Sequence, residues 1–315
     1  TDMLGKTAGG LYWMFRFLER AENNARLLEA GFRIALTRSS AAEAEWRSVI
    51  TTSAVRAQFD SKYSTYDSAS VTDFLLRDTD NLGSVLSVVK SARDNARLVR
   101  TALTTEVWSA VNETWMLFKD LLQEPVPETE LPAVLATIRQ QCALVRGALT
   151  GTMLRNDMYD FCRLGTFIER TDSTARIIDV KYYALLPAPS MVGGRMDNVQ
   201  WETLLRSVSA HRSFRWAVDG DFTAANIASF LILDTRMPRS LSYSLGRIVT
   251  NLGYLAEEYG ETPASHDMAV ALRARVSKRD IGAIFEEGLH EFISSVLRDT
   301  ASLGQQIEQD YRFTR

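Results

Sequence analysis

The chain has 315 residues, and 36 Lys and Arg stand against 39 Asp and Glu, which gives a formal net charge of −3. This mildly acidic balance argues against a general nucleic-acid binder, because such a protein needs a basic surplus to neutralise phosphates. The hydrophobic fraction of 46% and the charged fraction of 24% are typical of a globular protein and exclude wholesale disorder.

Cysteine usage and hydropathy also limit the classes of protein. Cys142 and Cys162 form no CxxC pair, so we expect both to be reduced core residues. The sequence has no apolar run of ~18 residues and no leader-like start, so we expect a cytoplasmic protein without a transmembrane helix.

The predicted elements are all helical. The seven prolines leave long intervals rich in Ala, Leu, Arg and Glu, and no alternating apolar pattern bounded by tight turns indicates a strand. We therefore predict an all-α bundle of about ten helices, with a linker near 123–132 and a loop over 187–195. The predicted helices cover 6–37, 41–60, 70–77, 81–122, 129–151, 153–186, 197–219, 223–233, 239–260, 265–278 and 280–311.

The sequence resembles itself. FLERAENNAR at 17–26 matches FIERTDSTAR at 167–176, a shift of 150 residues from Phe17 to Phe167. Farther along, Trp46 matches Trp201, and FLLRDTDNLGSVLSVV at 74–89 matches FLILDTRMPRSLSYSL at 230–245. Ordered matches whose shift grows slowly are what an internal duplication with short loop insertions produces.

From these matches we predict two related halves that pack about a pseudo-two-fold axis. The first repeat covers 1–125, a connecting segment and helix cover 126–152, and the second repeat with C-terminal helices covers 153–315, within one compact unit. The repeated Trp46 and Trp201 are predicted core anchors. Asp78 and Asp234 are predicted helix N-caps.

The repeated segments carry charged stripes. At 100° per residue, Glu19, Glu22 and Arg26 share one face of the first helix, and Glu169, Asp172 and Arg176 share the same face of the second. Arg20 and Arg170 lie about a quarter-turn away from the neighbouring glutamates. The segment before the first stripe, 11–18, is apolar on every face, which is typical of a buried helix.

The stripes have two interpretations. In the structural one, Glu22 with Arg26 and Asp172 with Arg176 are ordinary i, i+4 ion pairs, or a buried network that fastens the halves together. In the functional one, the stripes face each other and line one cleft, in which guanidinium groups grip carboxylate or phosphate. The carboxylates would then orient those arginines, hold an amine or hold a divalent cation.

Other kinds of site have little support in the sequence. The paired acids lack the Glu-x-x-His segments of a ferritin-like di-iron centre, so we predict no metal site and no cofactor, with a carboxylate-bound Mg²⁺ as the weaker alternative. Phosphate-binding loops, dinucleotide-binding glycine motifs and the serine nucleophile elbow are missing. Arginines at 206, 212, 215, 236, 239 and 247 are interpreted as a solvated face or a protein contact.

The opening MLGKTAGGLYWMFRFLERAENNARLLEAGFRIAL resembles the Alpha-E family of bacterial all-helical proteins, which is named for a Glu-Arg motif. Glu19 and Arg20 match that motif, and Glu169 and Arg170 resemble a second copy. SARDNARLVR and VWSAVNETW at 107–115 are also similar to the family, while Lys6 stands where arginine is commoner. The resemblance extends over nearly the whole chain.

The resemblance implies a partner. Family members are usually encoded beside, or fused to, a circularly permuted ATP-grasp protein, and transglutaminase-like proteins are frequent neighbours. ATP-grasp enzymes join carboxylates to amines through an acyl phosphate, so the resemblance implies a system that forms peptide or amide bonds. It implies no activity for the helical protein itself, and its oligomeric state stays open.

We therefore expect a partner or substrate-binding component of such a system, with an anionic or peptide-like ligand in the cleft. Its expected ligand-binding residues are Arg20, Glu22, Arg26, Arg170, Asp172 and Arg176. The first alternative is an enzyme in its own right, with Glu19 or Glu169 as general base and Mg²⁺ as an optional cofactor, acting on amides or phosphorylated intermediates. The second is a non-catalytic scaffold with structural ion pairs.

Overall fold

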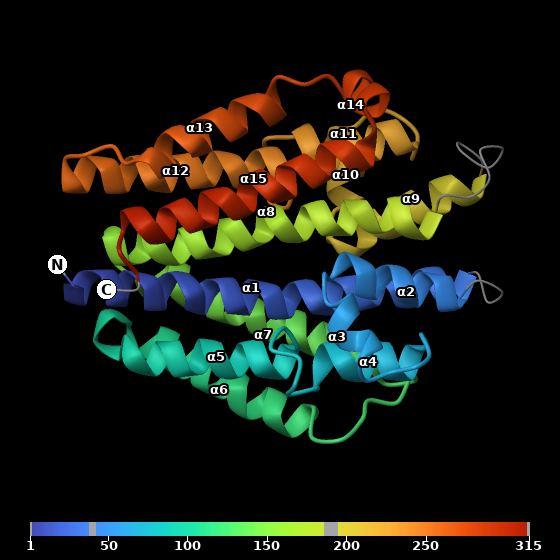
Figure 1. The fold of residues 1–315 in the computed structure, drawn as a ribbon, viewed down its shortest axis with the longest axis horizontal. Helices are drawn as coiled ribbons and strands as arrows, with labels where there is room; N and C mark the ends of the chain where they lie inside the picture. Colours follow the sequence, from blue (N-terminus) through green and yellow to red (C-terminus); the bar gives the residue numbers. More distant parts are fainter. Residues whose placement is uncertain (1, 38–41, 186–194, 314–315) are drawn as a thin grey trace.

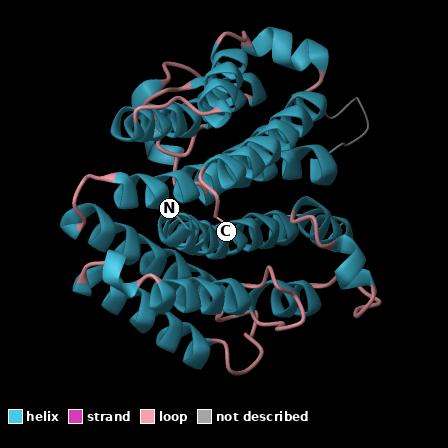
Figure 2. Cartoon of the chain, turned by 60° about the vertical axis from the view of Figure 1, so that its left-hand side comes forward, coloured by secondary structure: helices cyan, strands magenta, loops and turns pink. Residues whose placement is uncertain are grey.

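The computed structural model describes residues 2–37, 42–185 and 195–313, and this part of the chain is helical with no strand (Figure 2). The predicted all-α class is confirmed. The loop predicted over 187–195 lies almost wholly outside the described residues. The helices are α1 (Asp2–Thr37), α2 (Ala42–Thr52), α3 (Arg56–Asp60), α4 (Ser68–Leu76), α5 (Val85–Leu98), α6 (Thr105–Leu121), α7 (Leu131–Thr152), α8 (Asp157–Leu185), α9 (Arg195–Ser207), α10 (His211–Ala217), α11 (Ala224–Leu233), α12 (Leu241–Tyr259), α13 (Ala264–Ser277), α14 (Ile281–Glu287) and α15 (Leu289–Asp310).

The helix count of about ten was too low, because four predicted intervals each contain a break. Ala54 (φ 59°), Ser209 (φ 57°) and Gly288 (φ 107°) lie between α2 and α3, α9 and α10, and α14 and α15, and a positive φ ends a right-handed helix. Between α5 and α6 the chain forms a short 3₁₀ turn, after which the Thr104 side chain caps α6 by accepting from the Val107 amide.

Two long helices, α1 and α8, pack side by side through the centre of the molecule (Figure 1). α5 and α7 pack on α1, and α12 and α15 pack on α8. α2 and α9 each contact both central helices. The remaining helices extend this arrangement on either side, so the α1–α8 contact is the seam between two groups of helices.

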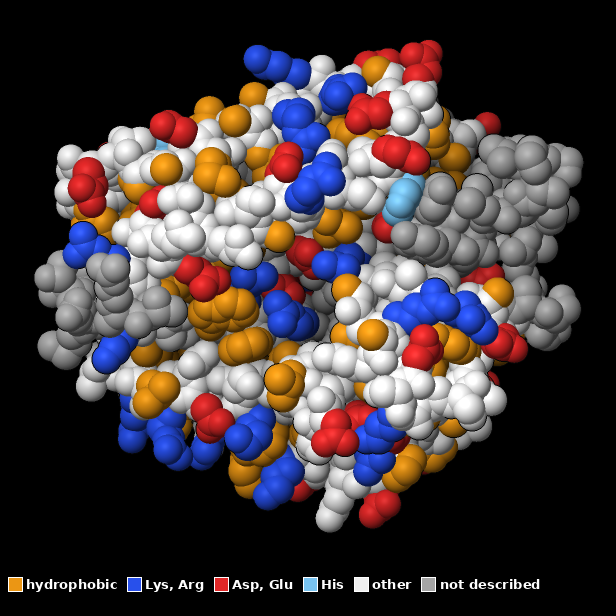
Figure 3. Space-filling view, in the orientation of Figure 1, with side chains coloured by type: hydrophobic (Ala, Val, Ile, Leu, Met, Phe, Trp, Pro, Cys, Tyr) orange, Lys and Arg blue, Asp and Glu red, His pale blue; other side chains and the backbone are white. Residues whose placement is uncertain are grey.

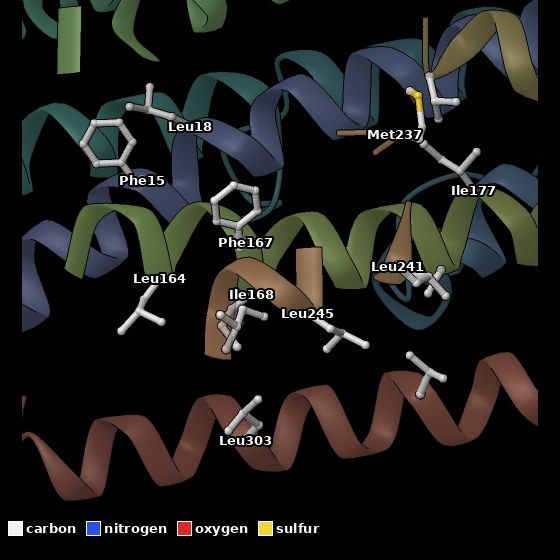
Figure 4. Close-up of a cluster of buried hydrophobic side chains, with 14 of the residues drawn as sticks. Phe15, Leu18, Leu164, Phe167, Ile168, Ile177, Met237, Leu241, Leu245 and Leu303 are labelled. Atoms are coloured by element: carbon white, nitrogen blue, oxygen red, sulfur yellow. The ribbon is translucent and has the colours of Figure 1, made fainter. Parts of the chain in front are cut away.

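Apolar side chains fill the space around the seam. Phe15 and Leu18 from α1, Leu164 and Phe167 from α8, and Leu303 from α15 are all buried in one cluster (Figure 4). The predicted anchors Trp46 and Trp201 are buried as well. Fully burying one such side chain is worth about 1.5–3 kcal/mol, so this core holds the central helices in a fixed register.

A glycine sets how closely the central helices approach. A Cβ added at Gly165 of α8 would lie 2.1 Å from the Tyr12 carbonyl oxygen of α1. Only a residue without a side chain fits there, so the two backbones can come together. Glu169 lies one turn beyond this point on α8, and the close approach brings the charged stripes of the two helices within reach of each other.

Serines are the N-caps of the two helices for which the sequence predicted aspartate N-caps. Ser84 and Ser240 accept from backbone amides at the starts of α5 and α12. Asp78 and Asp234 lie earlier, in the preceding turns, where each accepts from the amide two residues on. The expectation that these aspartates are N-caps was wrong, because the Asp-Thr pair forms a local turn before the helix begins.

Both cysteines are buried and free, in agreement with their predicted core positions. Among the helices of the described residues, none is long and apolar enough to cross a membrane.

Candidate functional site

The two Glu-Arg pairs are partners of each other across the α1–α8 contact. Arg170 of α8 donates to both carboxylate oxygens of Glu19, with Nε–Oε1 at 2.8 Å and Nη2–Oε2 at 3.1 Å. Arg20 of α1 donates in the same way to Glu169, with Nε–Oε1 at 2.6 Å and Nη2–Oε2 at 3.1 Å. Two-point charge-assisted bonds of this kind fix both partners. The exchange places the two motifs at one location in the seam.

The carboxylates of Glu19 and Glu22 are enclosed by arginine. We call this set the closed cluster: Glu19, Glu22, Arg26, Arg146, Arg170 and Arg239. Arg239, just before α12, donates to Glu19 at 3.1 Å and to Glu22, and Arg146 of α7 contacts the same two carboxylates. Arg26 donates to Glu22 at 2.7 Å and to the Ser207 carbonyl at 2.6 Å. Both glutamates are almost fully buried, so little of this cluster is open to a ligand.

Arginine keeps the closed cluster ionised. Burial would raise the pKa of Glu19, but Arg170, Arg239 and Arg146 outweigh burial and lower that pKa to about 2. The pKa of Glu22 is lowered for the same reason. Burial lowers the pKa of Arg239 to about 9, which still leaves its guanidinium charged at neutral pH.

The repeated acids of α8 are less enclosed. We call this set the open cluster: Glu169, Asp172, Arg16, Arg20 and Arg176. Arg16 donates to Glu169 at 2.9 Å beside Arg20, and these arginines outweigh burial and lower the pKa of Glu169 to about 2. Arg176 donates to Asp172 at 2.6 Å and to the Thr52 carbonyl at 3.0 Å. The side chains of Asp172 and Arg20 remain 22% and 32% exposed.

A polar cavity of about 350 Å³ adjoins the open cluster. All five members of the cluster line it, together with residues from α1, α4, α15, the turn after α2 and the turn before α5. In the space-filling view, basic and acidic side chains lie next to each other along the seam (Figure 3). The other lining residues are Asn23, Asn24, Ser53, Val55, Leu75, Asn81, Gly83 and Ala301.

The structure separates the candidate residues into two groups. Arg20, Glu169, Asp172 and Arg176 line the cavity. Glu19, Glu22, Arg26 and Arg170 form the buried, arginine-rich network that the structural interpretation describes. Each candidate therefore has its place at the seam, and half of them reach a cavity.

Three arginines of the site were not among the candidates. Arg239 was grouped with a solvated face, but its side chain is 11% exposed and contacts Glu19 and Glu22. Arg16 offered a signal, because a single cation within an apolar helical segment needs an acidic partner. Arg146 follows the buried Val145 on α7, but nothing in its spacing points to α1.

Further cavities lie elsewhere. One of about 860 Å³ is lined mainly by residues of α1 and α5, among them Trp13, Phe17 and Leu98. Another, of about 480 Å³, lies between α8 and α12 and contains Asp160, whose pKa is raised to about 6 by burial although Asn251 donates to it at 2.7 Å. Within the described ranges, no group of three or more His, Cys, Asp and Glu residues is placed to hold a metal ion.

Comparison with known proteins gives one family. A model of the Alpha-E family, described as a predicted alpha-helical domain with a conserved ER motif, matches residues 3–311. Uncharacterized proteins of Mycobacterium bovis and Mycobacterium tuberculosis are each 24% identical over 310 residues, which cover 91% of this chain and 34% of theirs. The chain thus spans about a third of the length of these relatives. No solved structure matches it. Because the family match covers nearly all of the sequence and includes both Glu-Arg pairs at the seam, the chain belongs to the Alpha-E family.

Proposed function

We propose that the chain is a cytoplasmic substrate-binding partner of a circularly permuted ATP-grasp protein in a system that forms peptide or amide bonds. The observation that carries the binding role is the cavity beside the open cluster. It presents both guanidinium and carboxylate groups, together with carboxamides, within about 350 Å³. Peptide termini and amino acids carry both charges, and such a site can pair with each of them.

The acid–base properties of the motif favour binding over catalysis. A general base works best when its pKa lies near the working pH. Glu19 and Glu169 have pKa values of about 2, because arginines hold their ionised forms. These carboxylates are weak bases, well suited to fixing arginines in place.

The stand-alone enzyme is the second candidate, and Asp160 is the observation that favours it. Its pKa of about 6 and its position at the 480 Å³ cavity are suited to proton transfer. Turnover by the purified chain without any partner, lost in Asp160→Asn, would favour this candidate over the binding role.

The length of the relatives supports a component role. In the mycobacterial proteins the matched segment is about a third of the chain, so the family domain is joined there to further sequence. A domain that is joined to further sequence in its relatives fits a protein that works next to a partner.

We further propose that the chain arose by duplication, and the helix bounds support this. α4 and α11 begin at Ser68 and Ala224, a shift of 156 residues, and α5 and α12 begin at the same shift. α7 and α15 both have 22 residues and are shifted by 158, from Leu131 to Leu289. Six buried α7 positions fall on buried α15 positions: Val134, Leu135, Ile138, Cys142, Val145 and Leu149 on Phe292, Ile293, Val296, Thr300, Leu303 and Ile307. In this proposal α7 is the last helix of the first repeat.

The test of the partner role is co-purification with a circularly permuted ATP-grasp protein of the same organism, followed by ATP hydrolysis with a panel of amino acids and peptides. We expect a stable complex whose turnover requires the Alpha-E chain. Arg20→Ala should abolish that turnover without unfolding the protein, because Arg16 still pairs with Glu169. Arg97→Ala, at an exposed position of α5, is the matched control. No complex and no dependence of turnover on the chain would refute the proposal.

A further inference from the structure

The backbone places Gly83 and Arg239 in matching environments. Gly83 comes just before α5, and its carbonyl oxygen accepts from Asn24 Nδ2 of α1 at 2.7 Å. Arg239 comes just before α12, and its carbonyl oxygen accepts from Thr174 Oγ1 of α8 at 2.9 Å. Each residue therefore sits in the turn that faces a central helix, one residue before the serine N-cap of the next helix.

The two residues differ in the side chain that they place in the seam. The Arg239 side chain runs to Glu19 and Glu22 and helps to fill the closed cluster. Gly83 has no side chain, and it lines the cavity of the open cluster. At the shift that relates α7 to α15, Gly304 likewise stands where α7 carries Arg146. At Gly304 that space is taken by the Tyr12 hydroxyl and Arg16 Nη1, at 3.4 and 3.6 Å from an added Cβ. The cavity therefore corresponds to the space that the Arg239 side chain fills at the closed cluster.

The charges of the two clusters differ by one cation. In the closed cluster, two carboxylates contact four guanidinium groups. In the open cluster, two carboxylates contact three among the described residues. Glu22 pairs with three arginines, whereas among the described residues its counterpart Asp172 pairs with Arg176 alone and is more exposed. One more cation beside Asp172 would give the open cluster the composition that already exists in the closed one.

A buried carboxamide adds a hydrogen-bond acceptor. Asn23 lines the cavity and is 7% exposed. Its Oδ1 atom is buried and has no hydrogen-bond partner in the part of the chain that the structure describes. A buried polar atom without a partner costs about 1–3 kcal/mol, so an N–H donor placed here is favoured.

We propose that the cavity is a receptor for a guanidinium or ammonium group of the ligand, which pairs with Asp172 and Glu169 and takes the place that Arg239 holds at the closed cluster. This inference rests on the proposed binding role and specifies its substrate class as a molecule with a cationic group, such as an arginine-containing peptide. Arg20 and Arg176 remain at the cavity wall to pair with a carboxylate of the same molecule.

The probes are L-arginine and L-citrulline, which share the amino-acid part and differ at the terminal group, a charged guanidinium in arginine and a neutral urea in citrulline. Titration calorimetry on the whole chain should show arginine binding at least about tenfold more tightly than citrulline, because the difference is a charge-assisted hydrogen bond. L-Glutamate and inorganic phosphate should bind more weakly than arginine.

Two variants locate the effect. Gly83→Arg supplies the missing side chain and should abolish arginine binding. Its added Cβ meets only Asn81 Oδ1, at 3.2 Å, so the variant can fold. Gly147→Arg makes the same change where nothing lies within 4 Å and should bind arginine like the parent chain. Asp172→Asn should lower arginine binding to the level of citrulline, and it serves if Gly83→Arg is unstable.

The outcomes separate this inference from the proposed function. Equal binding of arginine and citrulline, or binding of phosphate or glutamate in preference to arginine, would overturn the cationic ligand and leave the ATP-grasp partnership standing. No arginine binding up to about 10 mM would overturn it as well. Loss of partner-dependent turnover is scored in the co-purification assay and bears on the proposed function alone.

Discussion

Replacing Glu22 by Gln should destabilise the protein far more than replacing its counterpart Asp172 by Asn. Glu22 is 1% exposed and pairs with Arg26, Arg146 and Arg239. Removal of its charge leaves Arg146 and Arg239 with Glu19 as their remaining carboxylate in the cluster, and leaves Arg26 with the Ser207 carbonyl and the Ser209 hydroxyl. Breaking a buried pair in this way costs about 3–5 kcal/mol, because uncompensated charge stays buried.

Asp172 is partly exposed, and within the described ranges its one ion pair is with Arg176 on its own helix. Water and the Thr52 carbonyl can satisfy Arg176 when the charge of Asp172 is removed, so the cost should be about 1 kcal/mol or less. The two substitutions are chemically alike and lie at matched positions of α1 and α8. The difference between them therefore measures how far the closed cluster is desolvated.

Urea denaturation followed by far-ultraviolet circular dichroism measures both free energies of unfolding. We expect Glu22→Gln to lower the midpoint strongly and Asp172→Asn to lower it slightly. Equal losses in the two variants would refute the reasoning, since that result would mean that burial at the closed cluster does not set the energy of its ion pairs.

Three further predictions concern stability. The pKa of Glu19 is lowered to about 2, so the stability from this carboxylate is fully present above its unfolded pKa of about 4.3 and is lost as the pH falls toward 2. When the urea midpoint is measured at decreasing pH, it should fall less in Glu19→Gln than in the parent chain. Equal falls in the two proteins would contradict the assignment. The pKa of Asp160 is raised to about 6, so the destabilisation from burying its ionised carboxylate is absent below about pH 4 and grows as the pH rises through 6. Asp160→Asn should therefore be more stable than the parent chain at pH 8, by about 1 kcal/mol after screening by water, and equally stable at pH 4. Gly165→Ala should lower the free energy of unfolding by at least about 3 kcal/mol, and the melting temperature with it, because its Cβ would meet the Tyr12 carbonyl. Gly151→Ala, with nothing within 4 Å, should leave that free energy unchanged or raise it by up to about 1 kcal/mol. Similar effects of the two changes would show that the helices can separate freely.

Much of the fold can be predicted from the sequence because helix propensity depends on neighbouring residues. Long intervals without proline predicted the helices, and the apolar segment at 11–18 predicted a buried stretch of the central helix, where Leu11, Tyr12 and Phe15 are indeed buried. The breaks at Ala54 and Ser209 were missed because neither alanine nor serine signals a positive φ. Such a conformation is imposed by packing on either side of the residue, which no local pattern records.

The candidate site shows the same division. Periodicity alone placed Glu19, Glu22 and Arg26 on one face of a helix and Glu169, Asp172 and Arg176 on one face of another, because a 3.6-residue repeat fixes the direction of each side chain. The partners that come from other helices, Arg146 and Arg239, could not be found in this way, since their distance from Glu22 along the chain carries no information about their distance in space.

The sequence by itself determined the helical class, the family and the two charged stripes, all of which depend on local spacing or on similarity. Only the tertiary structure decided that one stripe is closed and the other opens on a cavity. The physical reason is the side chain that each neighbouring element delivers to the seam: arginine at 239 fills the space beside Glu22, and glycine at 83 leaves the space beside Asp172 empty.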